Sequence, residues 1–147
     1  MADNTSFSFT SKVLERTDFE VFRIRGEEAI SRPFRFEIDL VTDEPELDLA
    51  SVVGHEASLT IAQSGDSRTI DGVLASFEQK LALAADMYHY RAVLVPRLWL
   101  LSITHENRIF GTEEPVTVVD VIKEKLTYCA EVGIADSDFE LRLTHGY

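Results

Sequence analysis

The sequence contains a single cysteine, Cys129, and it lacks long apolar runs and a basic segment at its start. With one cysteine, no disulfide can form within the chain and no cysteine-based metal site can be built. No apolar run reaches the roughly 18 residues of a membrane-spanning helix. Residues 1–12 also lack the apolar core of a secretory signal peptide. We therefore predict neither a membrane span nor a secretory leader.

Positive charge is scarce, since 14 Lys and Arg stand against 26 Asp and Glu and leave a formal net charge of −12. Nucleic-acid binding depends on a basic surface, and anionic membranes attract basic segments, so neither is an expected partner. A hydrophobic content of 45% and a charged content of 27% are ordinary for a globular protein. At 147 residues we expect one domain, or one domain and the beginning of a second.

The motifs of common enzyme active sites are also missing. There is no G-x-S-x-G, no phosphate-binding P-loop and no G-x-G-x-x-G. Carboxylates gather in residues 43–48 and at Glu113-Glu114, which we interpret as solvated loops, because abundance without geometry does not define an acid–base pair. We predict no catalytic residue and no cofactor.

Four histidines are spread along the chain without metal-binding spacing such as H-x-H or H-E-x-x-H. We expect ordinary surface or hydrogen-bonded side chains at these positions, which are His55, His89, His105 and His145. Cys129 is interpreted as a small core residue of a helix. No metal site is predicted.

The longest stretch suited to burial is Tyr88–Leu101, YHYRAVLVPRLWLL. In an extended backbone, Tyr88, Tyr90, Ala92, Leu94 and Leu98 share one side, which predicts a core-facing strand. The other side carries His89, Arg91, Val93, Val95, Arg97 and Trp99. Proline cannot donate to a ladder, so the strand is expected to be an edge, bulged or ended at Pro96. Trp99 is expected to plug into the core where strand gives way to helix or loop.

The clearest strand is residues 34–40, where large apolar side chains alternate with charged ones. We predict that Phe34, Phe36, Ile38 and Leu40 point into a closed or nearly closed barrel. We expect the intervening Arg35, Glu37 and Asp39 to point out.

Other segments show weaker signals of the same kind. Strands are predicted near residues 7–10, 19–24, 57–61 and 68–79, the last with a bulge or bend at Gly72. Turns are predicted at 26–28 and 64–67, and a helical turn at 47–53. The strands at 68–80 and 87–97 are expected to pair antiparallel.

One amphipathic helix is predicted after Thr117, with Thr117 and Asp120 as a capping box and Gly133 as its end. Its apolar stripe would be Val118, Val119, Ile122, Leu126, Cys129 and Ala130. A last strand is predicted at 139–143. The expected fold class is mainly β, a β-rich α+β chain forming an antiparallel barrel or sandwich with one helix.

Several segments together resemble the start of the VgrG proteins, the tip proteins of the type VI secretion system, which are related to phage tail baseplate hubs. The most specific is LVPRLWLL at Leu94–Leu101, supported by SRPFRF at Ser31–Phe36 and by Arg108-Ile109-Phe110. Val53-Gly54-His55, Asp71-Gly72-Val73 and Phe77-Glu78 agree in order and spacing. The resemblance covers residues 7–147, and Gly111 departs from it where a glutamine is usual.

The resemblance implies an antiparallel β-barrel of the phage hub and VgrG N-terminal type. It implies a barrel module over residues 1–111 and the start of the next hub module over 112–147, within a longer chain. It also implies a non-enzymatic homotrimeric hub that docks on the hexameric Hcp tube and helps deliver effectors. Such a protein would be cytoplasmic before assembly and then secreted or injected with the apparatus.

A second hypothesis stays open, namely a small β-barrel enzyme or ligand-binding domain with an unrecognised site. A pocket with convergent polar groups would favour this alternative. A broad flat apolar surface and trimer contacts would favour the hub.

Overall fold

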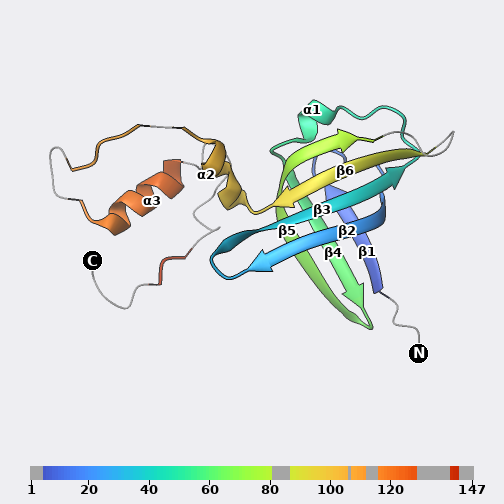
Figure 1. Cartoon of the computed structure of the whole chain (residues 1–147), viewed down its shortest axis with the longest axis horizontal. Helices are drawn as coiled ribbons and strands as arrows, with labels where there is room; N and C mark the ends of the chain where they lie inside the picture. Colours follow the sequence, from blue (N-terminus) through green and yellow to red (C-terminus); the bar gives the residue numbers. More distant parts are fainter. Residues whose placement is uncertain (1–4, 81–86, 106, 112–115, 129–139, 143–147) are drawn as a thin grey trace. The chain divides into compact units, whose positions relative to one another are not determined.

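The structure, a computed structural model, describes residues 5–80, 87–105, 107–111, 116–128 and 140–142 (Figure 1). The chain divides into two compact units, Met1–Pro96 and Arg97–Tyr147. The expected division into modules at 1–111 and 112–147 stays a prediction. Among the described residues, no helix is long and apolar enough to cross a membrane.

The first unit is a six-stranded antiparallel sheet that curls into a half-barrel (Figure 1). Its strand order is β1-β4-β5-β6-β3-β2, so β1 and β2 are the two edges. The strands are β1 (Thr5–Ser11), β2 (Glu20–Ala29), β3 (Arg32–Thr42), β4 (Glu56–Gln63), β5 (Asp66–Gln79) and β6 (Tyr88–Val95). The predicted β-rich antiparallel fold class is confirmed.

Strand β6 lies in the middle of the sheet, between β5 and β3. Tyr90, Ala92 and Leu94 on its inner side are 0% exposed, as their alternation predicts. On the other side Val93 and Val95 are buried as well. The strand ends at Val95 immediately before Pro96, which is one of the alternatives expected for that proline.

An aromatic cluster occupies the core and is organised around Phe19, which immediately precedes β2. The ring of Phe19 meets Phe9 of β1 at 5.7 Å, Phe77 of β5 at 6.2 Å and Tyr90 of β6 at 6.5 Å, each edge to face. Phe77 stacks on Tyr90 at 5.4 Å. These geometries are favourable for aromatic pairs, so one loop residue connects an edge strand with the centre of the sheet.

The alternation predicted for β3 is confirmed for most of its residues. Phe36, Ile38 and Leu40 are buried, Phe34 is half-buried and Arg35 is exposed. Asp39 points out of the barrel as predicted, yet it is only 6% exposed. It lies on the outer face, where neighbouring side chains cover it.

The turn predicted at 26–28 is wrong, because β2 continues through Gly26 to Ala29. Gly26 lies opposite Phe36, and a Cβ at this position would overlap the Phe36 ring. The glycine therefore allows a close aromatic contact inside a strand. The chain reverses at Ile30-Ser31, with Ser31 at a φ of 64°.

The hairpin between β4 and β5 turns at Ser64 and Gly65, which have φ values of 51° and 99°. Two residues with positive φ suit a two-residue hairpin. The bulge predicted at Gly72 is wrong in position, since the β5–β6 register shifts between Leu74 and Ser76. At Gly72 a Cβ would instead overlap the Val95 carbonyl oxygen.

The predicted helical turn is confirmed as α1 (Leu49–Val52), and the fully buried Val52 packs in the core. After Pro96 the chain forms a short 3-10 helix, Arg97–Trp99, and then α2 (Leu100–Ile103). The plug predicted at Trp99 is wrong, because Leu100 is buried and Trp99 only half-buried. In a helical turn, successive side chains do not alternate between two faces as they do in a strand. The run of apolar residues after Pro96 therefore did not show that Leu100, and not Trp99, is the buried residue.

The predicted helix is α3 (Val118–Tyr128), and its capping box is confirmed. The Thr117 amide donates to Asp120 Oδ2 at 3.0 Å, and the Asp120 amide donates to Thr117 Oγ1 at 3.2 Å. Val118 and Ile122 of the predicted apolar stripe are exposed. Cys129, Ala130 and Gly133 lie outside the described residues, and of the strand predicted at 139–143 only residues 140–142 are described, without strand structure.

We predict that Phe36→Ala lowers the free energy of unfolding by about 3–5 kcal/mol, the usual cost of truncating a buried aromatic side chain. Equilibrium urea denaturation of both proteins measures the difference. Arg35→Ala, one position away on the exposed side, is the matched control and should change stability little. A loss under about 1 kcal/mol for Phe36→Ala would remove this residue from the core.

Candidate functional site

Charged side chains form rows across the outer face of β2, β3, β6 and β5. In the main row Arg23 lies opposite Asp39, Asp39 opposite Arg91, and Arg91 opposite Glu78. Residues directly opposite in antiparallel strands project from the same face and lie close together. The signs alternate along the row, so each charge has opposite charges beside it.

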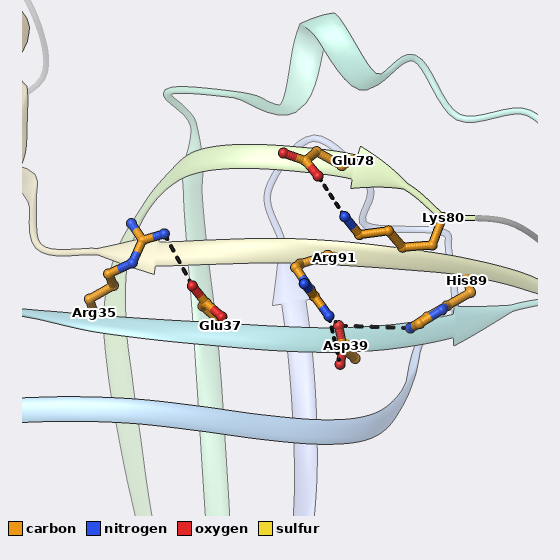
Figure 2. Close-up of polar contacts among 7 residues, drawn as sticks. All are labelled: Arg35, Glu37, Asp39, Glu78, Lys80, His89 and Arg91. Carbon is orange, nitrogen blue, oxygen red and sulfur yellow. Dashed lines mark hydrogen bonds and ion pairs between the residues drawn. The ribbon is translucent and has the colours of Figure 1, made fainter.

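Two shorter rows repeat the arrangement on β2 and β3. Arg25 lies opposite Glu37, and Glu27 opposite Arg35. Two further ion pairs join residues two positions apart in the sequence (Figure 2). Arg35 pairs with Glu37 within β3 at 3.3 Å, and Lys80, which follows β5, pairs with Glu78 at 2.8 Å. These exposed pairs contribute little to stability individually, and they fix the pattern of charge on this face.

The buried centre of this face is Asp39, which Arg91 holds through two hydrogen bonds (Figure 2). Arg91 Nε donates to Asp39 Oδ1 at 2.8 Å, and the guanidinium NH2 group donates to Oδ2 at 3.3 Å. Bidentate pairing of this kind is strong and geometrically specific. It joins β3 to β6 outside the core, on the face opposite Leu40 and Tyr90.

The hydrogen bond from Arg91 lowers the pKa of Asp39 below its ordinary value of 3.8. Burial opposes this shift, whereas the charges of Arg91, His89 and Arg23 reinforce it. The same contact raises the pKa of Arg91. Asp39 is therefore a charged structural residue at neutral pH, and a general acid or base would need a pKa closer to neutrality.

His89 lies beside this pair, with Nε2 3.8 Å from Asp39 Oδ1, a separation too long for a hydrogen bond (Figure 2). Among the described residues its buried Nε2 has no hydrogen-bond partner. Its ring meets Phe22 edge to face at 6.3 Å, and Phe22 is 64% exposed at the bulge of β2. The exposed Phe22 side chain, which packs against His89, therefore lies next to the charged rows.

The other histidines do not gather here. His55 is exposed, with Nδ1 3.4 Å from the Val53 carbonyl oxygen, and His105 is exposed as well. His145 and Cys129 lie outside the described residues. Across residues 5–80, 87–105, 107–111, 116–128 and 140–142, no group of three or more metal-binding side chains is placed to hold an ion. The expected absence of a metal site stays a prediction.

The carboxylates of residues 43–48 are exposed, as expected for a solvated loop. Asp48 has a structural role, since the Ser51 amide donates to its Oδ1 at 3.4 Å and caps α1. Glu113 and Glu114 lie outside the described residues.

A groove of about 270 Å³ lies at the ends of β1 and β4 and is lined by Thr10–Lys12, Glu15 and Glu56–Ser58. Its volume is just below the ~300–1,000 Å³ typical of small-molecule sites. Lys12 and Glu56 form an exposed ion pair at 3.1 Å in it. The lining of the groove is almost entirely polar, whereas small-molecule sites are lined mainly by apolar side chains, so the groove gives little support to the alternative of a ligand-binding domain.

The second unit has its own polar contacts. Arg108 pairs with Glu124 of α3 at 2.7 Å. The Phe110 ring lies 5.7 Å from the Arg108 guanidinium and 5.6 Å from Lys125 Nζ, within cation–π range. The Arg108-Ile109-Phe110 segment is therefore attached to α3.

The Asp39–Arg91 pair was missed in the sequence analysis. The alternation of each strand placed both residues on outer faces. Their pairing needs the register between strands that lie 52 positions apart, which single-strand patterns do not contain. The available signal was an acidic residue in one apolar strand and a basic residue in another, Asp39 and Arg91, each on the face opposite the core.

Comparison with known proteins gives a consistent set of relatives. The profile of the phage tail baseplate hub (GPD) family matches residues 27–147. The type VI secretion system spike protein VgrG5 of Pseudomonas aeruginosa is 39% identical over 109 residues, covering 74% of this chain and 13% of VgrG5. VgrG1b of the same organism, also named a spike protein, is 33% identical over 126 residues, covering 85% of this chain and 16% of VgrG1b.

A solved structure shares the fold. The E. coli c3393 protein, described as a component of the type VI secretion system with structural similarity to the T4 bacteriophage tail proteins gp27 and gp5, superposes with a TM-score of 0.70. It is 24% identical, and the match covers 81% of this chain and 31% of c3393. The chain spans only 13% of the length of VgrG5 and 16% of the length of VgrG1b.

We predict that Asp39→Asn lowers the free energy of unfolding by about 1–3 kcal/mol, because it removes the charged acceptor of two hydrogen bonds. The folded-state pKa of Asp39 is depressed, so its contribution is present above pH 3.8 and is lost as the pH falls through the lower folded value. The stabilities of the two proteins should therefore converge under strong acid. Urea denaturation from pH 2 to pH 7 measures both effects.

Glu46→Gln, in the exposed loop, is the matched control and should change stability by less than about 0.5 kcal/mol. If Asp39→Asn behaved like Glu46→Gln at pH 7, the buried pair would not contribute to the stability of the sheet.

Proposed function

Because the chain belongs to the phage tail baseplate hub family, we propose that it is the opening module of a hub at the tip of a type VI secretion apparatus. The observation that carries this proposal is the family match over residues 27–147, which begins in β2 and includes the second unit. The similarity to spike proteins at 33% to 39% identity supports the same role. The fold shared with c3393 is compatible with it.

The proposed partners are further copies of the same chain and the hexameric Hcp tube. In the full-length protein, three copies would form a ring that docks on the tube and helps deliver effectors. A curled sheet with fixed rows of charge is a rigid surface, and electrostatic complementarity sets orientation and specificity between protein partners. We place residues 1–111 in a first barrel module and residues 112–147 at the start of the next.

The proposed role is structural and non-enzymatic. The best-defined polar cluster, Asp39 with Arg91 and His89, has its acid held in the charged form by hydrogen bonds and neighbouring cations. This favours a positioning role over proton transfer. The protein would reside in the cytoplasm until assembly and then leave the cell with the apparatus.

A pull-down with the cognate Hcp tests the function directly. The 147-residue chain and the full-length protein are each immobilised, incubated with Hcp hexamers and washed at physiological salt. Retention of Hcp by the full-length protein is the expected result, with weaker retention by the short chain. Beads without immobilised protein are the control for nonspecific capture. If neither wild-type protein retained Hcp, tube docking would be refuted.

We also predict that the 147-residue chain is a monomer or weak oligomer, whereas the full-length protein is a trimer. Stable interfaces bury about 1,200–2,000 Å². The short chain covers only 13% of the length of VgrG5. Each copy carries a net charge of −12, so the copies repel one another unless salt screens them. Raised salt should therefore increase any self-association of the short chain.

Sedimentation of the short chain at micromolar concentration, in low and high salt, measures this. A tight trimer that loosens as salt is added would contradict the prediction and indicate that complementary charges hold the ring.

A further inference from the structure

Beyond the end of β6, the sheet divides into two hairpin arms. Strand β6 stops at Val95, which pairs with Val73 of β5, and β3 pairs with β6 only from Phe36 onward. Residues 32–35 of β3 therefore form an arm with β2, and residues 66–72 of β5 form an arm with β4. In Figure 1 these two arms, the β2–β3 arm and the β4–β5 arm, leave the end of β6 in different directions. Because β6 does not extend between them, its backbone ladders do not fix the angle between the arms.

Each arm has a glycine at its base. Gly26 of β2 lies opposite Phe36, the first residue of β3 that pairs with β6. Gly72 immediately precedes Val73, the first residue of β5 that pairs with β6, and the register of β5 with β6 is irregular just beyond this point. Glycine leaves the backbone freer than any other residue does, and a bulge bends a strand. The angle of each arm therefore needs a further contact to hold it.

An ion pair connects the two arms. Arg68 of the β4–β5 arm donates from Nη1 to Oε2 of Glu28 at 2.9 Å and from Nη2 to Oε1 at 2.5 Å. Glu28 belongs to the β2–β3 arm, 40 positions earlier in the sequence. Two parallel hydrogen bonds between a guanidinium and a carboxylate fix direction as well as distance. The contact therefore holds one arm at a defined position relative to the other.

Both side chains project from the inner face of the sheet, at the rim of the core. Arg68 lies opposite Ile61 of β4, which packs against the core and itself lies opposite Phe7 of β1. Residues directly opposite in antiparallel strands share a face, so Arg68 is on the core side. Glu28 follows Glu27 of the outer charged rows, and alternation along β2 directs it inward. The ion pair thus crosses the open end of the half-barrel on its concave side.

We propose that the Glu28–Arg68 pair is a latch that fixes the angle between the two arms, which separate when the pair is broken. Exposed ion pairs usually add little to global stability, and bidentate geometry is the exception. Each arm keeps its own strand pairing up to its turn, so opening is a hinge motion at the arm bases and not an unfolding of the sheet. The latch acts within one copy and does not depend on the proposed docking on Hcp or on the number of copies in the hub.

The latch should respond to salt. The side chains of Arg68 and Glu28 are 61% and 39% exposed, so dissolved ions reach the pair. The screening length falls from about 8 Å at physiological ionic strength to about 3 Å at 1 M. The arms should therefore separate more often as salt is raised.

Distance measurement between the arms tests the latch. In a Cys129→Ala background, Ile30→Cys at the turn of the β2–β3 arm and Ser67→Cys near the turn of the β4–β5 arm carry spin labels for double electron–electron resonance. Both positions are exposed. The labelled chain is diluted with unlabelled chain, so that distances between copies do not contribute. With the ion pair intact, we expect one narrow distance distribution at low salt.

Arg68→Ala should broaden this distribution and move it by about 4 Å or more, because 4 Å is the limit within which an ion pair is held. Glu28→Arg should do the same, and the exchanged pair Glu28→Arg with Arg68→Glu should restore the narrow distribution. Arg35→Ala is the matched control. It removes an ion pair that lies within the β2–β3 arm, so it should leave the distance between the arms unchanged.

A salt titration tests the latch with Glu28 and Arg68 both in place. Raising the salt to 1 M should broaden the distribution of the labelled protein, and returning to low salt should narrow it again. Circular dichroism confirms that each variant is folded. A narrow, unshifted distribution for folded Arg68→Ala, an exchanged pair that does not restore it, or a distribution that salt leaves unchanged would each overturn the proposal.

Discussion

Complete burial of the inner face of β6 is the constraint on which the rest of the sheet depends. Tyr90, Ala92 and Leu94 have no contact with solvent, so a strand must lie on each side of β6 and aromatic rings must cover it. Phe19 and Phe77 provide that cover. Apolar burial of this kind is the main favourable term in folding. The curl of the sheet follows, because a flat sheet would leave this face open to water.

The outer face of the same strand has a different role. There Arg91 fixes Asp39 across the β3–β6 pair, and oppositely charged residues continue the row on both sides. A chain with a net charge of −12 thus keeps one face on which charge is nearly balanced and held in place. A surface with fixed charges can set the orientation of a protein partner. The family relationship and the geometry therefore support the same structural role.

The sequence predicted the features that depend on local pattern, and it failed where contacts between distant segments decide. The alternation in Phe36, Ile38 and Leu40 predicted their burial, and the spacing of Thr117 and Asp120 predicted a cap. Gly26 was assigned to a turn because glycine favours turns, whereas the reason for it is the Phe36 ring on the neighbouring strand. The pattern placed Asp39 on the outer face, but its burial there was not predicted because its partner is 52 positions away. Burial of Leu100 rather than Trp99 depends on helical geometry after Pro96.

Hydrogen exchange of the backbone amides, resolved by NMR in the 147-residue chain, tests the central position of β6 most directly. Amides of a strand that pairs on both sides and is buried exchange only through large opening motions, whereas edge strands exchange through local fraying. The account predicts the slowest exchange in β6 and the adjoining part of β3, and the fastest strand exchange in β1 and β2. Exchange in β6 as fast as in the edge strands would contradict it.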